Sequence, residues 1–477
     1  MKPKISVLGA GPGGYVAAVR AAQLGAEVTI VENDSVGGTC LNWGCIPSKI
    51  LKSAADRLVD IKHAGLFGIK ADPNPEVDIQ ALSDRKEKII QAQRRGIKTL
   101  LEHHGIHHLK GRGRIKAAGV VTVADADNRL QEVVYEHLII ATGSRPLDIP
   151  AFAFDGRRII SSNEALYLDE IPGSIVIVGG GVIGCEFAGI FSAFGSKVTV
   201  VEALDRLLPL PAVDADCSKV LAREMKKRRI AFFVNRIVES VDSSGDLLNV
   251  KVAPSPFAEN LQAKDKKPLE IKAEKVLVCI GRTANTLDIG LENIGVATDE
   301  RGWIVADDNL KTNVDGVFAI GDVLGPAKVM LAHVASTEGM VAAENILGAS
   351  RRMDYSAVPG AVFTSPEVGN VGLSETQARE TGVSVRADTV LFRMVGKAQV
   401  IGEIAGQAKI VSDADSGRIL GVHIIGPHAS DLIAEGTLAI RNGLTVRQLA
   451  ETIHAHPTLA EIMMETGFKA LDRGLHG

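Results

Sequence analysis

The sequence predicts an α/β protein with two Rossmann-like dinucleotide-binding domains and a C-terminal α+β domain. The first observation is a glycine-rich turn between an apolar strand and an Ala-rich helix near the start of the chain. The second is the return of the same pattern further along. The third is the end of such patterns after about residue 348, where strands alternate with helices. A chain of 477 residues is long enough for three or four domains.

The first nucleotide-binding pattern starts with a buried strand at Ile5–Gly9, which leads into the turn and the helix. Glu27–Glu32 reads as the next strand and ends in an acid. In such turns the first glycine permits the tight bend, the second lets the backbone approach a pyrophosphate, and the third lets helix and strand pack closely. The carboxylate of Glu32 would accept hydrogen bonds from an adenosine ribose. The three glycines are Gly9, Gly11 and Gly14.

The second copy repeats the strand, turn, helix and strand in the same order and with the same spacing. Its strands are Ile175–Gly179 and Lys197–Glu202, and the helix between them runs to Phe194. One glycine pattern is weak evidence, but two copies in this context outweigh the alternative, glycines that serve only strand-helix packing. Because the carboxylate of Glu202 would repel a 2′-phosphate, the second site should prefer NAD to NADP. The glycines of this copy are Gly179, Gly181 and Gly184.

Three further apolar strands indicate how the chain is divided. Leu138–Ile140 lies between the two copies, and Val276–Ile280 closes the second nucleotide domain. Gly316–Ile320 then delivers Asp322 at its carboxyl end, where sheets of this class bind ligands. We predict a first nucleotide-binding domain at residues 1–147, a second at 148–277, a central domain at 278–347 and a mixed domain at 348–477.

The composition excludes several classes of function. The net charge is −4, only 4% of residues are aromatic and basic residues are scattered, which argues against binding nucleic acid. The apolar stretch Ile175–Phe194 contains five glycines and Glu186, so a buried strand-turn-helix fits it better than a membrane span. Five cysteines at irregular spacing are unlike a secreted disulfide framework. We therefore expect a cytoplasmic protein, in which a cysteine pair is redox-active or binds a metal.

A cysteine pair, Cys40 and Cys45, closely follows the first nucleotide pattern. Gly44 gives the chain the freedom to fold the second cysteine back towards the first, and Pro47 suits the opening turn of a helix. Lys49 would share a helical face with Cys45, and a cation and a helix N-terminus both favour the thiolate, so at least one sulfur should have a lowered pKa. The alternatives are ordinary buried thiols and half a zinc site, but zinc sites usually show shorter spacing and a second Cys or His pair.

Four histidines with i,i+4 spacing are a second candidate for a metal site. They are His103, His104, His107 and His108. Because no carboxylate or thiol nearby completes a coordination set, we interpret them as a solvated helix end and strand start, and we predict no metal.

Two further positions carry groups that need an explanation. Glu186 lies on an otherwise apolar helix, where an ionised carboxylate must be paired or solvated. Pro457 keeps His456 out of helical geometry and starts a helix carrying Glu461, which can fold back to orient the imidazole. A histidine so held can take a proton from a thiol near neutral pH. Taken alone, a helix-face glutamate that reaches water and a surface histidine remain alternatives.

The segment Gly37–Lys49 resembles the active-site segment of the FAD-dependent pyridine nucleotide-disulfide oxidoreductases. The two glycine patterns, Ala141–Gly143 and Gly321–Asp322 match that family in the same order, and the resemblance covers essentially the whole chain. It implies that the first pattern binds FAD, that the second binds NAD(P), and that the last domain forms the interface of a homodimer. The cofactor-binding residues implied are Gly9, Gly11, Gly14, Glu32, Gly38, Thr39, Lys49, Gly113, Asp322, Ala332, Gly179, Gly181, Gly184, Glu186, Glu202 and Gly281.

The resemblance also implies roles for individual side chains. Lys49 would lie near the flavin N5 and pair with Glu186, and Asp322 would contact the ribityl-phosphate region of the flavin. His456 and Glu461 match the catalytic base and its orienting acid, which the partner subunit supplies. A substrate thiolate would attack Cys40 of the Cys40–Cys45 disulfide, and Cys45 would then pass electrons to FAD. His454 matches no role in this scheme.

Within the family, three features favour one substrate class. The chain is more similar to the members that oxidise protein-bound dihydrolipoamide with NAD than to glutathione or mercuric reductases. The similarity lies in Met330–Gly339, Glu202 and His454–Thr458. The expected partners are therefore lipoyl domains of 2-oxoacid dehydrogenase or glycine cleavage complexes. One departure is Ala284, where the family commonly has proline. The alternatives are another NAD(P)H-dependent disulfide reductase, an NADH oxidase or transhydrogenase, and a non-catalytic subunit that holds both cofactors.

Overall fold

The computed structural model describes residues 2–72, 74–259 and 267–476, so residues 260–266 of the predicted second nucleotide domain lie outside the described part. The chain forms two compact units, each assembled from three segments of the sequence. The first unit comprises Met1–Leu51, Asp78–Leu147 and Gly281–Tyr355. The second comprises Lys52–Val77, Asp148–Ile280 and Ser356–Gly477.

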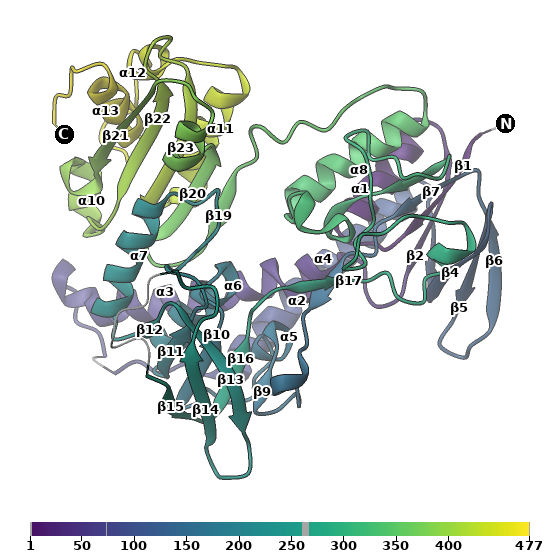
Figure 1. Cartoon of the computed structure of the whole chain (residues 1–477), viewed down its shortest axis with the longest axis horizontal. Helices are drawn as coiled ribbons and strands as arrows, with labels where there is room; N and C mark the ends of the chain where they lie inside the picture. The colour runs from purple at the N-terminus through teal and green to yellow at the C-terminus, as the bar shows by residue number, and fades with distance from the viewer. Residues whose placement is uncertain (1, 73, 260–266, 477) are drawn as a thin grey trace. The chain divides into compact units, whose positions relative to one another are not determined.

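A parallel five-stranded sheet forms the centre of the first unit. Its strands are β1 (Lys4–Leu8), β2 (Glu27–Glu32), β3 (His107–Lys110), β7 (His137–Ile140) and β18 (Val317–Ala319). They follow the order β18-β7-β1-β2-β3, with the predicted strand β1 in the middle. Figure 1 shows the helices α1 (Pro12–Gln23) and α8 (Ala332–Ile346) side by side. The two helices approach so closely at Gly339 that a Cβ there would lie 2.5 Å from the carbonyl oxygen of Gly13.

The remaining elements of the first unit surround this sheet. They are the helices α2 (Gly38–Trp43) and α4 (Ile79–His103), the antiparallel sheet of β4 (Arg112–Ala117), β5 (Val120–Ala124) and β6 (Leu130–Val134), and the paired strands β8 (Ser144–Pro146) and β17 (Arg282–Ala284). Helix α3 (Cys45–His63) begins in the first unit and ends in the second.

The nucleotide-binding part of the second unit repeats the parallel arrangement. Its strands are β9 (Ile159–Ile160), β10 (Ser174–Val178), β11 (Lys197–Val201), β12 (Ala231–Phe233) and β16 (Lys275–Val278), in the order β12-β11-β10-β16-β9. The antiparallel strands are β13 (Arg236–Asp242), β14 (Leu248–Pro254) and β15 (Leu269–Ala273), and the helices are α5 (Ser162–Ala165), α6 (Val182–Ala193) and α7 (Ala215–Lys227).

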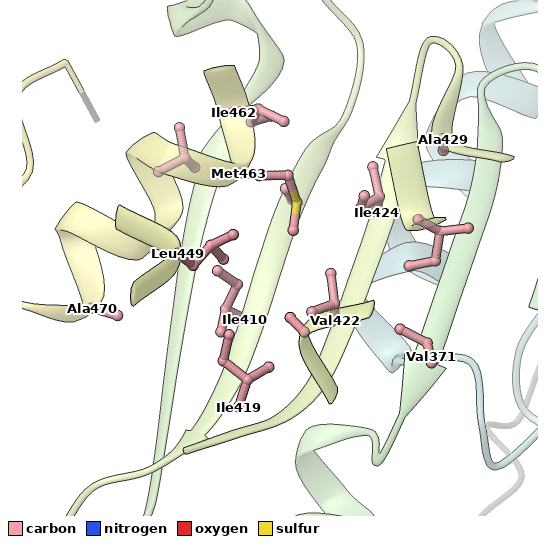
Figure 2. Close-up of a cluster of buried hydrophobic side chains, with 14 of the residues drawn as sticks. Val371, Ile410, Ile419, Val422, Ile424, Ala429, Leu449, Ile462, Met463 and Ala470 are labelled. Atoms are coloured by element: carbon pink, nitrogen blue, oxygen red, sulfur yellow. The ribbon is translucent and has the colours of Figure 1, made fainter. Parts of the chain in front are cut away.

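The C-terminal part of the second unit is an antiparallel sheet with helices. Its strands are β19 (Gly360–Val362), β20 (Glu367–Gly372), β21 (Val385–Leu391), β22 (Gln407–Asp413) and β23 (Ile419–Gly426), in the order β19-β20-β23-β22-β21. Its helices are α9 (Glu375–Glu380), α10 (Gly396–Ile401), α11 (Ala429–Arg441), α12 (Val446–Ala450) and α13 (Glu461–Ala470). Figure 2 shows Leu449, Ile462 and Met463 in one apolar cluster with Ile410 and Val422 of the sheet.

The predicted fold class is confirmed. In both copies the glycine turn joins a parallel strand to a helix, as β1 to α1 and as β10 to α6. The apolar stretch Ile175–Phe194 is divided between a strand and a helix, as predicted. Over the described residues, every helix is too short or too polar to cross a bilayer.

One boundary prediction is wrong. Pro457 was expected to start the helix that carries Glu461, but α13 begins at Glu461 itself. The carboxylate of Glu461 accepts a hydrogen bond from the backbone N–H of Thr458, 2.9 Å away. The four residues between His456 and Glu461 therefore precede the helix, and the acid reaches back over them.

A buried ion cluster joins the nucleotide-binding part of the second unit to its C-terminal sheet. Because side chains alternate along a strand, Lys409 points to the face of β22 opposite Ile410. Its Nζ lies 3.0 Å from Asp214, 2.6 Å from Asp216 and 2.7 Å from Glu375, and only 6% of the lysine side chain is exposed. Burial alone would raise the pKa of Asp214, but hydrogen bonds and the charge of Lys409 hold it below its ordinary value.

Replacing Lys409 with methionine should lower the free energy of unfolding by about 3–5 kcal/mol, because the carboxylate of Asp214, with 4% of its side chain exposed, would stay buried without its cation. Urea unfolding followed by circular dichroism measures the change. The matched control is Lys219→Met, which removes the 76%-exposed ammonium that contacts Asp216 at 2.9 Å. That change should cost about 1 kcal/mol or less. Equal losses in the two variants would contradict the assignment.

The loss of unfolding free energy in Lys409→Met should also depend on pH. The pKa values of Asp214 and Glu375 are lowered from ordinary values of 3.8 and 4.5, so the folded state binds protons less readily than the unfolded state. The contribution of these two carboxylates to the free energy of unfolding is fully present above those values and is lost as the pH falls below them. The difference between wild type and variant should therefore shrink in acid.

Candidate active site

The first glycine turn leaves no room for side chains at two positions. Gly9 has φ +100°, and a Cβ there would lie 2.3 Å from the carbonyl oxygen of Ala141. A Cβ on Gly14 would lie 1.9 Å from the carbonyl oxygen of Gly9. Gly11 precedes α1, so the N–H groups of the first helical turn face the site. The turn thus has the geometry expected of a pyrophosphate-binding site.

Glu32 ends β2 beside this turn. Its carboxylate accepts the N–H of Ala10 at 2.7 Å and the N–H of Asp34 at 2.8 Å. Burial raises the pKa of Glu32 more than these bonds lower it. The acid is thereby fixed at the carboxyl end of its strand, the position that a ribose contact requires.

Two observations on neighbouring segments test whether a dinucleotide fits here. A Cβ on Gly38 would lie 2.6 Å from the Cα of Gly11, so α2 starts directly against the glycine turn. The hydroxyl of Thr142, next to the residue that Gly9 touches, is buried with no hydrogen-bond partner among the described residues. A glycine-lined cradle with an unsatisfied hydroxyl suits a polar ligand, so these residues fit a dinucleotide.

Asp322 follows β18 at the same edge of the sheet. Its Oδ2 accepts a hydrogen bond from the Ser144 hydroxyl at 2.7 Å, and the Nε of Arg282 donates to that hydroxyl at 2.6 Å. Burial lowers the pKa of Arg282 despite the nearby carboxylate. The buried Glu338 accepts the N–H of Gly321 at 2.6 Å and holds the turn before the aspartate. Sequence reasoning missed Glu338, because this contact joins two elements.

The cysteines lie at the junction of two helices. Cys40 is in α2 and Cys45 is the first residue of α3, with Gly44 between the helices. A Cβ on Gly44 would lie only 3.1 Å from the carbonyl oxygen of Thr39, a close approach that agrees with the predicted need for glycine. Cys45 is exposed and Cys40 is partly buried. The pair is therefore brought together as predicted.

Cys40 is not the sulfur with the lowered pKa that the sequence predicts for at least one of the pair, and for Cys45 the lowered pKa stays a prediction. The hydrogen bond with Cys45, burial and the negative charge of Cys45 raise the pKa of Cys40, and the ammonium of Lys49 offsets only part of this. The raised pKa favours the protonated form of Cys40. We therefore expect that a reduced pair that has lost one proton carries its negative charge on Cys45.

Asn42 fixes the loop that carries the cysteines, a role that sequence reasoning missed. Its buried amide donates to the carbonyl oxygens of Gly38 at 2.8 Å and Val36 at 3.2 Å. Its Oδ1 accepts from the Nε of Arg94, on α4, at 2.6 Å. The side chain of a distant helix thus positions α2, and no local pattern could have revealed this contact.

The second glycine turn repeats the geometry of the first. Gly179 has φ +106°, and a Cβ on Gly184 would lie 1.9 Å from its carbonyl oxygen. A Cβ on Gly181 would meet nothing within 4 Å. The buried Glu202 accepts the N–H of Gly180 at 2.6 Å and the N–H of Leu204 at 2.8 Å. The residues at this turn therefore also fit a dinucleotide.

Glu186 is buried on α6, with 7% of its surface exposed. Its carboxylate accepts the backbone N–H of Phe363 at 2.9 Å. The alternative of a glutamate that simply reaches water is therefore wrong. Glu186 and Glu202 belong to the second unit, whereas Lys49 belongs to the first.

The structure brings His456 and Glu461 together. The Nδ1 of His456 lies 2.9 Å from Oε1 of Glu461, and 78% of the imidazole is exposed. Burial would raise the pKa of Glu461, but the hydrogen bonds from His456 and Thr458 lower it overall. An ionised carboxylate that accepts from Nδ1 leaves Nε2 directed outwards to take a proton.

The remaining predicted residues are placed as follows. Thr39 lies on α2, Ala332 is the first residue of α8, Gly113 lies on β4 against Leu8, and Gly281 has φ +143° next to β17. The four-histidine candidate ends α4 and continues into β3, as interpreted from the sequence.

The chain matches known families over most of its length. The family model described as pyridine nucleotide-disulphide oxidoreductase matches residues 3–339, and that described as the dimerisation domain of the same family matches residues 358–466. The dihydrolipoyl dehydrogenase of Chlamydia muridarum is 43% identical over 472 residues, which cover 98% of this chain and 97% of the relative. That of Geobacillus stearothermophilus is 41% identical over 471 residues, 98% of this chain and 96% of the relative.

Two solved structures are also similar. LpdA from Mycobacterium tuberculosis is 28% identical with a TM-score of 0.88, and the match covers 98% of this chain and 99% of LpdA. RclA from Escherichia coli, an HOCl-induced flavoprotein disulfide reductase, is 27% identical with a TM-score of 0.83, over 97% of this chain and 99% of RclA.

Proposed function

Since this chain belongs to the pyridine nucleotide-disulphide oxidoreductase family, we propose that it oxidises protein-bound dihydrolipoamide and reduces NAD, as a dihydrolipoyl dehydrogenase does. The family of dihydrolipoyl dehydrogenases uses FAD and NAD(H) as cofactors. The observation that carries the proposal is the hydrogen-bonded pair of Cys40 and Cys45 beside the first glycine turn. A dithiol at the start of a helix beside a dinucleotide site is suited to exchanging electrons with disulfides.

Each step of the proposed thiol chemistry is assigned to residues of this chain. His456, oriented by Glu461, takes a proton from one thiol of dihydrolipoamide. The resulting thiolate attacks Cys40 of the Cys40–Cys45 disulfide, and a substrate–Cys40 disulfide forms as Cys45 leaves as a thiolate. The second substrate thiol then displaces Cys40, its proton passes to the Cys40 sulfur, and the oxidised substrate departs. FAD, when bound, supplies the acceptor for the electron pair and passes it as hydride to NAD.

The second nucleotide site is expected to select NAD. Glu202 ends β11 with its carboxylate tied to two backbone N–H groups. Its negative charge would repel a 2′-phosphate, so NADP should bind poorly. We propose Lys49 and Glu186 as the groups that meet near the nicotinamide and the flavin.

The wider context is proposed on the same basis. The match to a dimerisation domain supports a homodimer in which the partner contributes His456 and Glu461. The proposed partners are lipoyl domains of 2-oxoacid dehydrogenase or glycine cleavage complexes, in the cytoplasm. We propose the four functional parts 1–147, 148–277, 278–347 and 348–477, the first and third of which complete the FAD site together.

Anaerobic titration of the purified protein with dihydrolipoamide tests the function directly. The flavin absorbance should fall, and addition of NAD should restore it with formation of NADH. A colourless protein, or a flavin that dihydrolipoamide leaves oxidised, would refute the proposal.

A second candidate is another NAD(P)H-dependent disulfide reductase. The likeness to RclA favours it, because that protein is a flavoprotein disulfide reductase. A panel of oxidised thiols with NADH and with NADPH separates the two. Faster turnover of a low-molecular-weight disulfide than of lipoamide would favour this candidate.

Replacing Gly181 with alanine should weaken NAD binding and leave the fold intact. A Cβ there meets nothing within 4 Å of the chain, so the new methyl group would occupy only the space that a pyrophosphate needs. We expect the KM for NAD to rise by about tenfold, about 1.4 kcal/mol. The control is Gly96→Ala, which also meets no neighbour but lies in the middle of α4 and should leave the KM unchanged. An unchanged KM in Gly181→Ala would exclude close approach of the pyrophosphate there.

A further inference from the structure

His454 is a buried imidazole next to an exposed one. Only 6% of its side chain is exposed, although it lies two residues before His456 in the loop between α12 and α13. Its Nδ1 is 2.8 Å from the carbonyl oxygen of Thr452, and its Nε2 is 2.8 Å from Oε1 of Glu435. Because a backbone carbonyl oxygen only accepts, Nδ1 donates to Thr452, and Nε2 is left to pair with the carboxylate of Glu435.

The pair fixes the loop to a well-supported element. Glu435 lies on α11, which packs against β20 and β23 of the C-terminal sheet. Further along the loop, the hydroxyl of Thr458 donates to the carbonyl oxygen of Ala455 at 2.7 Å. The loop is therefore tied at its start to α11 and at its end to Glu461, with His456 between the two ties.

We propose that His454 and Glu435 form a positioning pair for His456, which holds the loop that carries the proton acceptor against α11. This inference rests on the proposed function, because it assigns a role in the thiol step of that reaction. His454 touches neither substrate nor cofactor in this scheme and acts only through its neighbours. A small displacement of a catalytic group can cost about a hundredfold in rate, so a tie of this kind matters for the reaction.

The titratable groups around His454 come from α11, α13, its own loop and the C-terminal tail. Glu435 lies on α11, and Glu461 lies on α13. His456 lies on the same loop as His454, and the charge of Glu461 also reaches His476 of the tail. The positive charge of His454 is one of the causes that lower the pKa of Glu461. Loss of this charge should therefore move the protonation of Glu461 to higher pH.

Two variants of the holoenzyme test the pair. His454→Gln removes the imidazole, and Glu435→Gln keeps an acceptor but removes the carboxylate. The rate of flavin reduction by dihydrolipoamide should fall by about tenfold in both, and its acidic limb should move to higher pH in His454→Gln. Electron transfer from NADH to ferricyanide should be unchanged, because it needs no thiol proton transfer. Glu435→Asp, which keeps the charge, should recover part of the rate.

A matched control and the contrary outcomes complete the test. His428→Asn is the matched control and should behave as wild type. It removes another imidazole beside a carboxylate, since His428 lies 3.6 Å from Asp431 at the start of α11, the helix that also carries Glu435. If wild type itself is not reduced by dihydrolipoamide, the proposed function fails. If wild type is reduced and the variants match it, the positioning pair is refuted. Equal loss of the thiol and ferricyanide activities would assign His454 a merely structural role and would also refute it.

Discussion

Cys45→Ser should abolish oxidation of dihydrolipoamide while the protein keeps its FAD. Serine preserves the size of the side chain and the start of α3, so the glycine turn that holds the dinucleotide is unaffected. It cannot form the disulfide that accepts the substrate's electrons. Turnover should fall by roughly 10⁴-fold or more, as for loss of other catalytic nucleophiles. Steady-state NADH formation, with the flavin content from the absorption spectrum, measures both effects.

The partner variant Cys40→Ser sharpens this prediction. The two should be equally inactive with dihydrolipoamide, but they should differ in the long-wavelength absorbance that a thiolate beside a flavin produces. Because the raised pKa of Cys40 favours its protonated form, we expect the charge of the reduced pair on Cys45. Cys40→Ser should therefore retain this absorbance and Cys45→Ser should lose it. Cys217→Ala, which changes a buried thiol on α7, is the control for full activity. Retained turnover in Cys45→Ser would remove the basis of the proposed function.

The second large effect is expected from His456→Gln. Without the imidazole, the substrate thiol must ionise without help, and flavin reduction by dihydrolipoamide should slow by about 10²- to 10⁴-fold. Electron transfer from NADH to ferricyanide should be spared. Stopped-flow measurement of the two half-reactions separates these effects.

His476→Gln is the matched control for this variant. That imidazole also lies 2.9 Å from a carboxylate on α13, that of Glu465, but it belongs to the C-terminal tail. We expect both half-reactions of His476→Gln to remain close to wild type. If His456→Gln were as fast as this control, another group would have to take the proton.

Much of the fold could be predicted because its signals are local. The glycine spacing and the acids at Glu32 and Glu202 lie within single strand-turn-helix-strand stretches, and the structure forms both stretches as expected. The pairing of His456 with Glu461 is also local, since the two residues lie five positions apart in the sequence.

The contacts that escaped prediction join segments far apart in the sequence. Asn42 meets Arg94 across 52 residues, and Asp214 meets Lys409 across 195. Lysine within an apolar strand such as β22 gives no sign of its partners, and only the alternation of the strand shows that it faces away from the apolar cluster. The raised pKa of Cys40 also has a tertiary origin. Its hydrogen bond with Cys45 and its burial, which depend on tertiary structure, outweigh the effect of the nearby lysine.

The interleaved path of the chain has a consequence for how the molecule can be divided. The polypeptide passes between the two units after Leu51, Val77, Leu147, Ile280 and Tyr355. No single cut therefore yields two fragments that each contain one whole unit. A protease that nicks one crossing leaves the units covalently tied by the others on either side, and a ribosome must release most of the chain before either unit has all of its parts. Variants that isolate one unit would need rejoined segments rather than simple truncations.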